Sequence, residues 1–166
     1  MVFVGDMMVG KTRFIKFINE IPYDYIPCVF DNYNLEYTID NQKVICIFWN
    51  TACAEDYDRI RPLSYPNTNV FVLCYALNNP ESLQNIYSKW LPEIKAHTQV
   101  DIPFIILGMK SDLEYSHEIV NEALKIQMKT KAKDNLVCST ETNYNIRLTM
   151  DRALRVALEH YEETSK

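Results

Sequence analysis

Eight residues near the start of the chain have the types and spacing of a phosphate-binding loop. Gly5, Gly10, Lys11 and Thr12 fit the pattern G-x-x-x-x-G-K-[ST], between a short apolar run and a helix-like segment. Glycine lets the backbone curl so that successive N–H groups point at phosphate oxygens, and the helix N-terminus adds its dipole. Lys11 would supply a cation and Thr12 a hydroxyl for Mg²⁺. The predicted cradle consists of Gly5, Asp6, Met7, Met8, Val9, Gly10, Lys11 and Thr12.

Glycine is scarce in this chain, which makes its positions informative. The chain has 3 glycines, and two of them are the two that the phosphate loop requires. The third, Gly108, ends an apolar run and is followed by Lys110 and Asp112. Ligands bind at the carboxyl edge of open α/β sheets, and a carboxylate there can accept hydrogen bonds from N1 and N2 of guanine. Lys110 and Asp112 are therefore candidate base-reading residues.

Short apolar runs alternate with helix-like segments along the chain, which is typical of a mostly parallel sheet covered on both faces. We therefore predict an α/β fold with six strands, one of them antiparallel. Apolar stripes at helical spacing are expected in the core. The expected strands are 1–4, 35–39, 44–49, 70–77, 103–107 and 136–138, with a hairpin turn at Asp40 and Asn41. The expected helices include 12–19 and the stripes Leu83, Ile86, Trp90, Ile94 and Met150, Ala153 or Leu154, Ala157 or Leu158, Tyr161.

The composition is that of one acidic domain, which we expect to span residues 1–166. A net charge of -5 argues against general attraction to nucleic acid or to an anionic membrane surface. No stretch approaches the roughly 18 apolar residues of a membrane span, and no signal peptide is apparent. We therefore expect a cytoplasmic protein. Five cysteines without a C-x-x-C motif are expected to be reduced thiols in or near the core, namely Cys28, Cys46, Cys53, Cys74 and Cys138.

Over essentially its whole length the sequence resembles the Ras superfamily, and within it the Rho/Rac branch of small GTPases. The resemblance implies a small G-domain of the P-loop NTPase fold that binds GTP or GDP with Mg²⁺. It also implies nucleotide contacts from Tyr25, Cys28, Ser139 and Thr140. The matching segments are 5–12 (phosphate loop), 25–33 (switch one), 55–66 (switch two), 89–94 (a Rho-branch helix), 109–112 (guanine specificity) and 138–140 (the loop over the base).

The departures from the family pattern cluster where hydrolysis would occur. Met7 replaces a glycine and would project toward the γ-phosphate, into the space that an arginine finger enters. Cys28 and Asn50 stand where the family has a metal-binding threonine and a metal-side aspartate, and a thiol is a poor ligand for a hard cation. Cys53 replaces a glycine, and Ala54 replaces the glutamine that orients the attacking water. We therefore expect hydrolysis near background.

Contacts to the base also differ from the family. Ile21 replaces an aromatic residue that packs on guanine, and Thr140 replaces a small alanine beside it. Loss of an aromatic contact worth about 0.5 to 1.5 kcal/mol predicts faster nucleotide release.

The positions at which the family meets partners are kept, which implies protein effectors and regulators of Rho type. The segment between Asp112 and Cys138 is too short for the Rho insert helix. Residues 159–166 carry neither a C-a-a-X box nor a basic run, so no membrane anchor is expected. The conserved-looking partner positions are Tyr25, Val29, Phe30, Asp31, Tyr33, Trp49, Tyr57, Arg59 and Leu63.

Three functions are compatible with this sequence. The chain is a guanine-nucleotide-binding signalling module with very slow hydrolysis, a working GTPase switch completed by regulators in trans, or a nucleotide-free scaffold with a vestigial cradle. The first hypothesis leads, because an intact cradle lies beside a degenerate catalytic corner.

Overall fold

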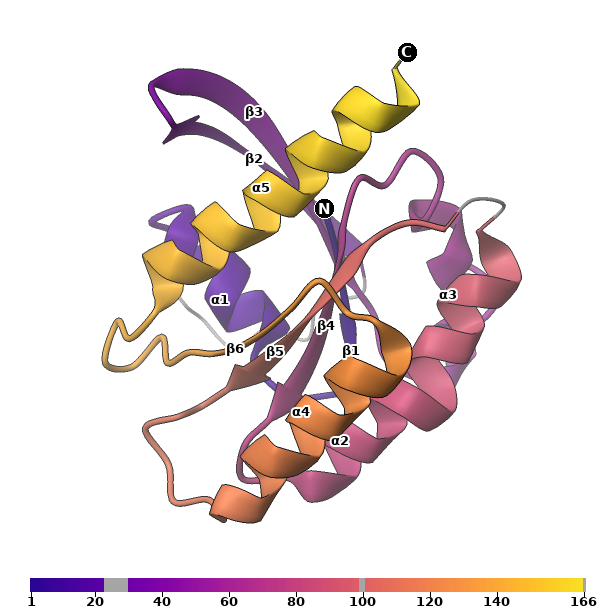
Figure 1. Cartoon of the computed structure of the whole chain (residues 1–166), viewed down its shortest axis with the longest axis vertical. Helices are drawn as coiled ribbons and strands as arrows, with labels where there is room; N and C mark the ends of the chain where they lie inside the picture. Colours follow the sequence, from indigo (N-terminus) through magenta and orange to yellow (C-terminus); the bar gives the residue numbers. More distant parts are fainter. Residues whose placement is uncertain (23–29, 99–100, 166) are drawn as a thin grey trace.

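The fold is one six-stranded sheet with helices on both faces. The structure is a computed structural model that describes residues 1–22, 30–98 and 101–165. The strand order is β2-β3-β1-β4-β5-β6, and every neighbouring pair is parallel except β2 with β3 (Figure 1). The predicted α/β class and the single antiparallel strand are confirmed. The strands are β1 (Val2–Gly5), β2 (Phe30–Ile39), β3 (Gln42–Thr51), β4 (Phe71–Ala76), β5 (Phe104–Met109) and β6 (Asp134–Val137).

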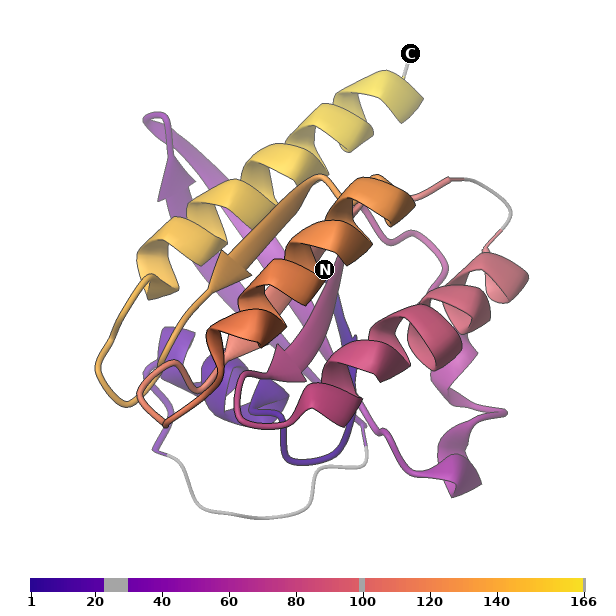
Figure 2. The ribbon, with the colours of Figure 1, turned by 60° about the horizontal axis from the view of Figure 1, so that its bottom comes forward.

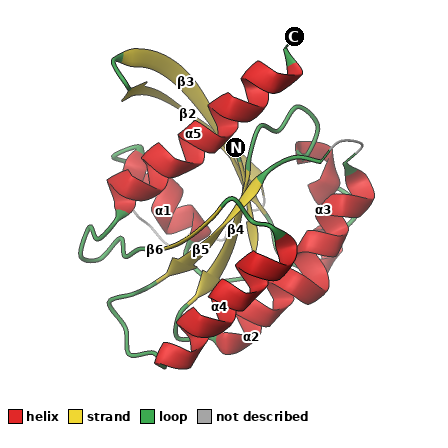
Figure 3. Cartoon of the chain, in the orientation of Figure 1, coloured by secondary structure: helices red, strands yellow, loops and turns green. Residues whose placement is uncertain are grey.

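The helices divide between the two faces of the sheet. One face carries α1 (Lys11–Ile18) and α5 (Ile146–Thr164), and the other carries α2 (Pro80–Asn85), α3 (Leu91–His97) and α4 (His117–Thr130), as Figure 3 shows. A π-helical turn, Ile86–Trp90, joins α2 to α3. Two short 3₁₀ turns, Glu55–Tyr57 and Arg61–Ser64, lie between β3 and β4.

The β2–β3 hairpin forms where the sequence predicted it. Asp40 and Asn41 have φ angles of 48° and 62°, the left-handed pair that a two-residue turn of type I′ requires. β2 starts at Phe30, five residues before the expected strand 35–39. Polar residues interrupt the apolar pattern in this part of β2, so the sequence did not predict it as strand. The strand lies at the sheet edge, where one face needs no apolar side chains.

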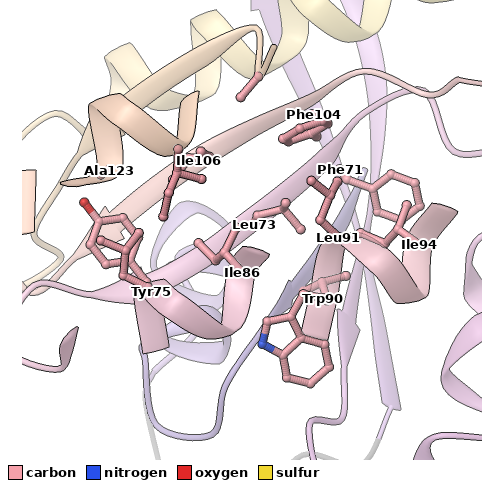
Figure 4. Close-up of a cluster of buried hydrophobic side chains, with 14 of the residues drawn as sticks. Phe71, Leu73, Tyr75, Ile86, Trp90, Leu91, Ile94, Phe104, Ile106 and Ala123 are labelled. Atoms are coloured by element: carbon pink, nitrogen blue, oxygen red, sulfur yellow. The ribbon is translucent and has the colours of Figure 1, made fainter. Parts of the chain in front are cut away.

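The apolar stripe that runs through α2, the π-helical turn and α3 is core, as predicted. Leu83, Ile86, Trp90 and Ile94 are all buried, and Figure 4 shows three of them against β4 and β5. In α5 the predicted apolar stripe is buried except for its last residue. Tyr161 is 57% exposed, so its assignment to the core is wrong.

Helix α4 is an element that the sequence analysis did not place. Its signals are present, because the Ser116 hydroxyl caps the first turn by accepting the N–H of Glu118, and Ile119, Ala123 and Ile126 are buried at helical spacing. Between Asp112 and Cys138, a segment that is described throughout, the structure has α4 and β6 as its only helix and strand. No helix in the described ranges is long and apolar enough to cross a bilayer.

Four of the five cysteines lie in the described part of the chain, and all four are free thiols. Cys46, Cys74 and Cys138 are buried and Cys53 is half-buried, as predicted, whereas Cys28 lies outside the described residues. Burial raises the pKa of the Cys138 thiol to about 12. Cys46, Cys74 and Cys138 are therefore core residues, and Cys53 packs at the edge of the core.

One buried hydroxyl in the core is unsatisfied. Tyr75, on β4, is fully buried, and its hydroxyl finds no hydrogen-bond partner among the described residues. The hydroxyl lies under Gly108, where an added Cβ would stand 2.7 Å from it. Gly108 is therefore the residue that makes room for this tyrosine.

We expect Tyr75→Phe to raise the free energy of unfolding by about 1 kcal/mol, because it removes a buried polar group that makes no hydrogen bond. For a chain of this size the melting temperature should rise by about 2–4 °C in calorimetry. The matched control is Tyr65→Phe, which removes a hydroxyl that donates to Glu93 and should therefore destabilise the protein. Equal destabilisation by both changes would contradict the prediction.

Candidate functional site

The loop after β1 needs glycine at the two positions that define the phosphate-loop pattern. Gly5 and Gly10 have φ angles of 153° and 120°, which residues with a Cβ rarely adopt. A Cβ on Gly5 would overlap the carbonyl oxygen of Cys74, and one on Gly10 would lie 3.2 Å from the sulfur of Met109. The loop lies at the carboxyl edge of the sheet, which Figure 2 turns toward the reader. The backbone of Cys74 and the side chain of Met109 thus leave no room for a Cβ at Gly5 and little room at Gly10.

Lys11 lies inside this loop. The residue is 6% exposed, and Nζ donates to the carbonyl oxygens of Gly5 at 2.7 Å and Asp6 at 2.8 Å. Burial lowers the pKa of the ammonium group, because desolvation penalises its charge. An ammonium group held in this way is placed to meet an anion that enters the loop.

Asp6 anchors the loop instead of facing the ligand with its side chain. Its two carboxylate oxygens accept hydrogen bonds from Asn85 Nδ2 and Trp90 Nε1, both at 2.7 Å. Met7 and Met8, by contrast, are 60% and 68% exposed, so their side chains project out of the loop. Asp6, Met7 and Met8 can therefore bind a phosphate only through their backbone N–H groups.

At the predicted metal position, the side chain of Asn50 places an amide where the family has a carboxylate. Asn50 is buried at the end of β3, and its Nδ2 donates to the hydroxyl oxygen of Thr12 at 2.8 Å. The structure therefore brings Thr12 and Asn50 together. Cys53 is half-buried and packs against the core, and Ala54 is half-buried beside it.

The predicted base-reading residues meet at the ends of β5 and β6. Ser139 Oγ donates to Asp112 Oδ1 at 2.5 Å, so the carboxylate is held by the loop that was expected to close over the base. Lys110 has a φ of 63° at the turn that leads there. A hollow of about 460 Å³ opens at this point, within the range of small-molecule pockets. Its lining includes Gly10, Arg13, Phe14, Met109, Lys110, Asp112, Cys138, Thr140 and Glu141.

A larger hollow, about 560 Å³, lies far from these motifs. It is formed at the amino-terminal edge of the sheet by residues of α3, α4 and α5, with Lys95 and Lys131 among its lining. None of the predicted site residues lines it. Size alone therefore does not locate the site, whereas the convergence of motif residues does.

The sequence analysis missed a buried ionic cluster beneath the expected switch-two segment. Arg61 is fully buried, and its guanidinium donates to Glu93 at 2.9 Å, to the Ala52 carbonyl at 3.0 Å and to Asp58. The same group lies 4.8 Å from the ring centre of Trp90. Arg61 lies in segment 55–66 and Glu93 in segment 89–94. Their opposite charges were the one sequence signal that could have predicted this contact. The cluster ties the segment to α3 and to Trp90.

The predicted partner-facing residues that the structure describes are accessible to different degrees. Asp31 and Arg59 are exposed and Leu63 is 76% exposed, so Leu63 is not a core residue. Tyr33 and Tyr57 are half-buried. Phe30 is placed only as the first residue of β2. Tyr25, Cys28 and Val29 lie outside the described residues.

A glycine loop between a parallel strand and a helix, with a buried lysine inside it, defines a P-loop α/β domain. The chain belongs to the Ras family, whose model matches residues 1–159, and within it to the Rho branch. It is 38% identical to the Ras-like GTP-binding protein RhoL of Drosophila melanogaster, over 98% of this chain and 88% of that protein. It is 36% identical to the Rho-related GTP-binding protein RhoB of Homo sapiens (96% and 88%) and 35% identical to the GTP-binding protein Rho1 of Kluyveromyces lactis (100% and 86%).

We expect Asp6→Ala to lower the free energy of unfolding by roughly 2–4 kcal/mol, because two partly buried donors, on Asn85 and Trp90, lose their acceptor. Asp6→Asn keeps one acceptor oxygen, so it should cost about half as much. Urea denaturation of both variants measures the difference. Equal stabilities of Asp6→Ala and the unchanged protein would show that the loop is not anchored in this way.

Proposed function

We propose that this protein binds GTP and GDP, hydrolyses GTP very slowly, and presents a Rho-like surface to effector and regulator proteins. The observation that carries the proposal is the contact between Asn50 and Thr12 beside a complete glycine cradle. The cradle keeps the groups that bind phosphate, whereas the neighbouring position has lost the carboxylate that would face a metal ion. Binding is thus retained where hydrolysis is not supported.

Guanine selectivity rests on Asp112. Its carboxylate is exposed at the hollow and is oriented by Ser139, so its free oxygen can accept from the N1 and N2 donors of guanine. The relatives RhoL, RhoB and Rho1 are described as GTP-binding proteins, which supports the same ligand here. We therefore assign the phosphates to residues 5–12 and the base to the loops that carry Lys110, Asp112, Ser139 and Thr140.

The described residues are a poor fit for the Mg²⁺ ion that the family implies. Mg²⁺ prefers carboxylate and phosphate oxygens in near-octahedral geometry. Thr12 and Asn50 bring a hydroxyl and an amide but no carboxylate, and no group of three metal-binding His, Cys, Asp or Glu side chains occurs in the part of the chain that the structure describes. Nucleotide affinity in this protein should therefore depend weakly on Mg²⁺.

We attribute slow hydrolysis to two side chains that cannot replace the catalytic residues of the family. Ala54 ends in a methyl group and cannot orient a water molecule by hydrogen bonding. Met7 is 60% exposed on the cradle, and we expect its side chain to occupy the space that an arginine finger would need. Since positioning and electrostatics supply nearly all the catalysis in phosphoryl transfer, the losses combine. We therefore regard GTPase activity as vestigial.

The proposed partner surface combines the exposed edge strand β2 with the segment 55–66. Leu63 and Ile60 are 76% and 43% exposed although both are apolar, and Arg59 beside them is exposed. Exposed apolar side chains with a charged rim are typical of protein-binding surfaces. We propose signalling partners of Rho type and a cytoplasmic site of action, with no role for nucleic acid.

The central experiment is to denature the purified protein and identify the nucleotide that it releases. Stoichiometric GTP, or a mixture rich in GTP, supports binding with slow hydrolysis. Protein without nucleotide that also gives no saturable signal with labelled GDP or GTP in excess magnesium supports a scaffold with a vestigial cradle. Rapid single-turnover cleavage with a Rho-type activating protein supports a switch completed in trans.

Asn50→Asp should restore a dependence on Mg²⁺ by returning a carboxylate to the metal position. We expect EDTA to speed GDP release by at least about tenfold in this variant and by less than about threefold in the unchanged protein. Release of a fluorescent GDP measures both rates. Asn50→Ala is the control, because it breaks the contact with Thr12 without adding charge. A similar EDTA effect in all three proteins would count against the prediction.

Met7→Gly combined with Ala54→Gln should raise the single-turnover rate of GTP hydrolysis by about tenfold or more, since it clears the cradle and supplies a water-orienting amide. Met7→Gly with Ala54→Leu is the matched control, because leucine fills similar volume without donors or acceptors. If both double variants hydrolyse GTP equally fast, the missing amide is not what limits the rate.

A further inference from the structure

An ion pair crosses the base end of the nucleotide site. Arg13 lies in the first turn of α1, directly after the cradle, and Glu141 lies in the loop after β6, 128 residues away in sequence. Arg13 Nη2 donates to Glu141 Oε2. The pair thus connects the element that starts at the phosphates with the loop expected to close over the base.

The pair stands at the boundary between two hollows. Arg13 and Glu141 line the hollow of about 460 Å³ that contains Asp112, and they also line a neighbouring recess of about 220 Å³. Phe17 and Ile21 line the recess, and Ile21 is the residue that replaces the family's base-packing aromatic. The guanidinium is therefore placed on the side of the base pocket where an aromatic surface was lost.

A continuous line of hydrogen bonds joins the ion pair to the base-reading carboxylate. Glu141 accepts from Arg13 through its side chain, and its backbone N–H donates to Ser139 Oγ at 3.1 Å. Ser139 Oγ in turn donates to Asp112 Oδ1. Because each member holds the next, a shift of Arg13 is transmitted to the group that selects the base.

The chemistry of arginine suits contact with a purine ring. A guanidinium group is planar and weakly hydrated, so it can stack on an aromatic face while its edge keeps an ion pair. The side chains of Arg13 and Glu141 are 45% and 59% exposed, so the pair is weak when water surrounds it. A base lying against it would remove water from one side and strengthen the pair.

From these observations we propose that Arg13 and Glu141 form a clasp that retains the purine base, in place of the missing aromatic residue. The inference rests on the proposed nucleotide binding and adds a specific prediction to it. Retention becomes dependent on an ion pair, so nucleotide release should respond to salt.

The test is a double-mutant cycle on the dissociation of GDP that carries a fluorescent ribose label. Arg13→Ala and Glu141→Ala should each speed release roughly threefold to tenfold. The double variant should release no faster than the faster single variant, because either change alone opens the clasp. The charge-swapped variant, Arg13→Glu with Glu141→Arg, should recover part of the slow release.

The matched control is the pair Arg155–Asp40, which joins α5 to the β2–β3 turn away from the site. Its side chains are 47% and 64% exposed, close to the values for Arg13 and Glu141. Arg155→Ala should leave GDP release unchanged. Raising NaCl from low to high concentration should speed release from the unchanged protein and have little effect on the Arg13→Ala, Glu141→Ala double variant.

The outcomes separate the two proposals. If the unchanged protein gives no saturable binding of labelled GDP, the proposed function and the clasp both fail. If it binds GDP but the Arg13 and Glu141 variants release within twofold of it, or their effects multiply in the double variant, only the clasp is overturned. Circular dichroism of each variant checks that faster release is not a consequence of unfolding.

Discussion

The close approach of the phosphate loop to β4 is the constraint on which the site depends. At Gly5 there is no room for a Cβ against the carbonyl of Cys74, and the φ angle of 153° is one that side chains disfavour. Because the loop lies directly on the sheet, its carbonyl groups turn inward and hold the buried ammonium of Lys11. A looser loop would leave that charge either hydrated or unpaired.

The loop is connected to Trp90 and to the Arg61–Glu93 pair through partly buried polar contacts. Asp6 accepts from Trp90, and the guanidinium of Arg61 lies over the Trp90 ring while it binds Glu93. Buried groups of this kind are costly when unpaired, so each contact restricts the next. The cradle and the 3₁₀ turn at Arg61 therefore form one mechanical unit. These contacts join the phosphate loop to the segment 55–66, which carries part of the proposed partner surface.

Local sequence signals predicted the strands, the hairpin turn and the cradle, since each depends on residues close together in the chain. Asp40 and Asn41, for example, specify their own turn. The signals did not predict the π-helical turn or the contacts of Arg61, because these depend on packing between distant segments. The ion pair of Arg13 with Glu141 belongs to the same class, with 128 residues between its members. The prediction that Tyr161 belongs to the core was wrong because it used a local signal alone. Helical spacing cannot show where a helix stops packing on the sheet.

The amide of Asn50 changes the direction of a hydrogen bond as well as a charge. A carboxylate can only accept, so Thr12 would have to donate its hydroxyl proton to it and keep its lone pairs for a cation. Asn50 instead donates through Nδ2, which occupies a lone pair of Thr12 and frees the hydroxyl proton. The Thr12 hydroxyl can then donate a hydrogen bond to a phosphate oxygen, whereas a hydroxyl hydrogen that points into the site disfavours a metal ion. An asparagine at this position therefore removes a carboxylate from the expected metal side and adds a donor beside the phosphate loop, which agrees with the proposed combination of nucleotide binding and slow hydrolysis.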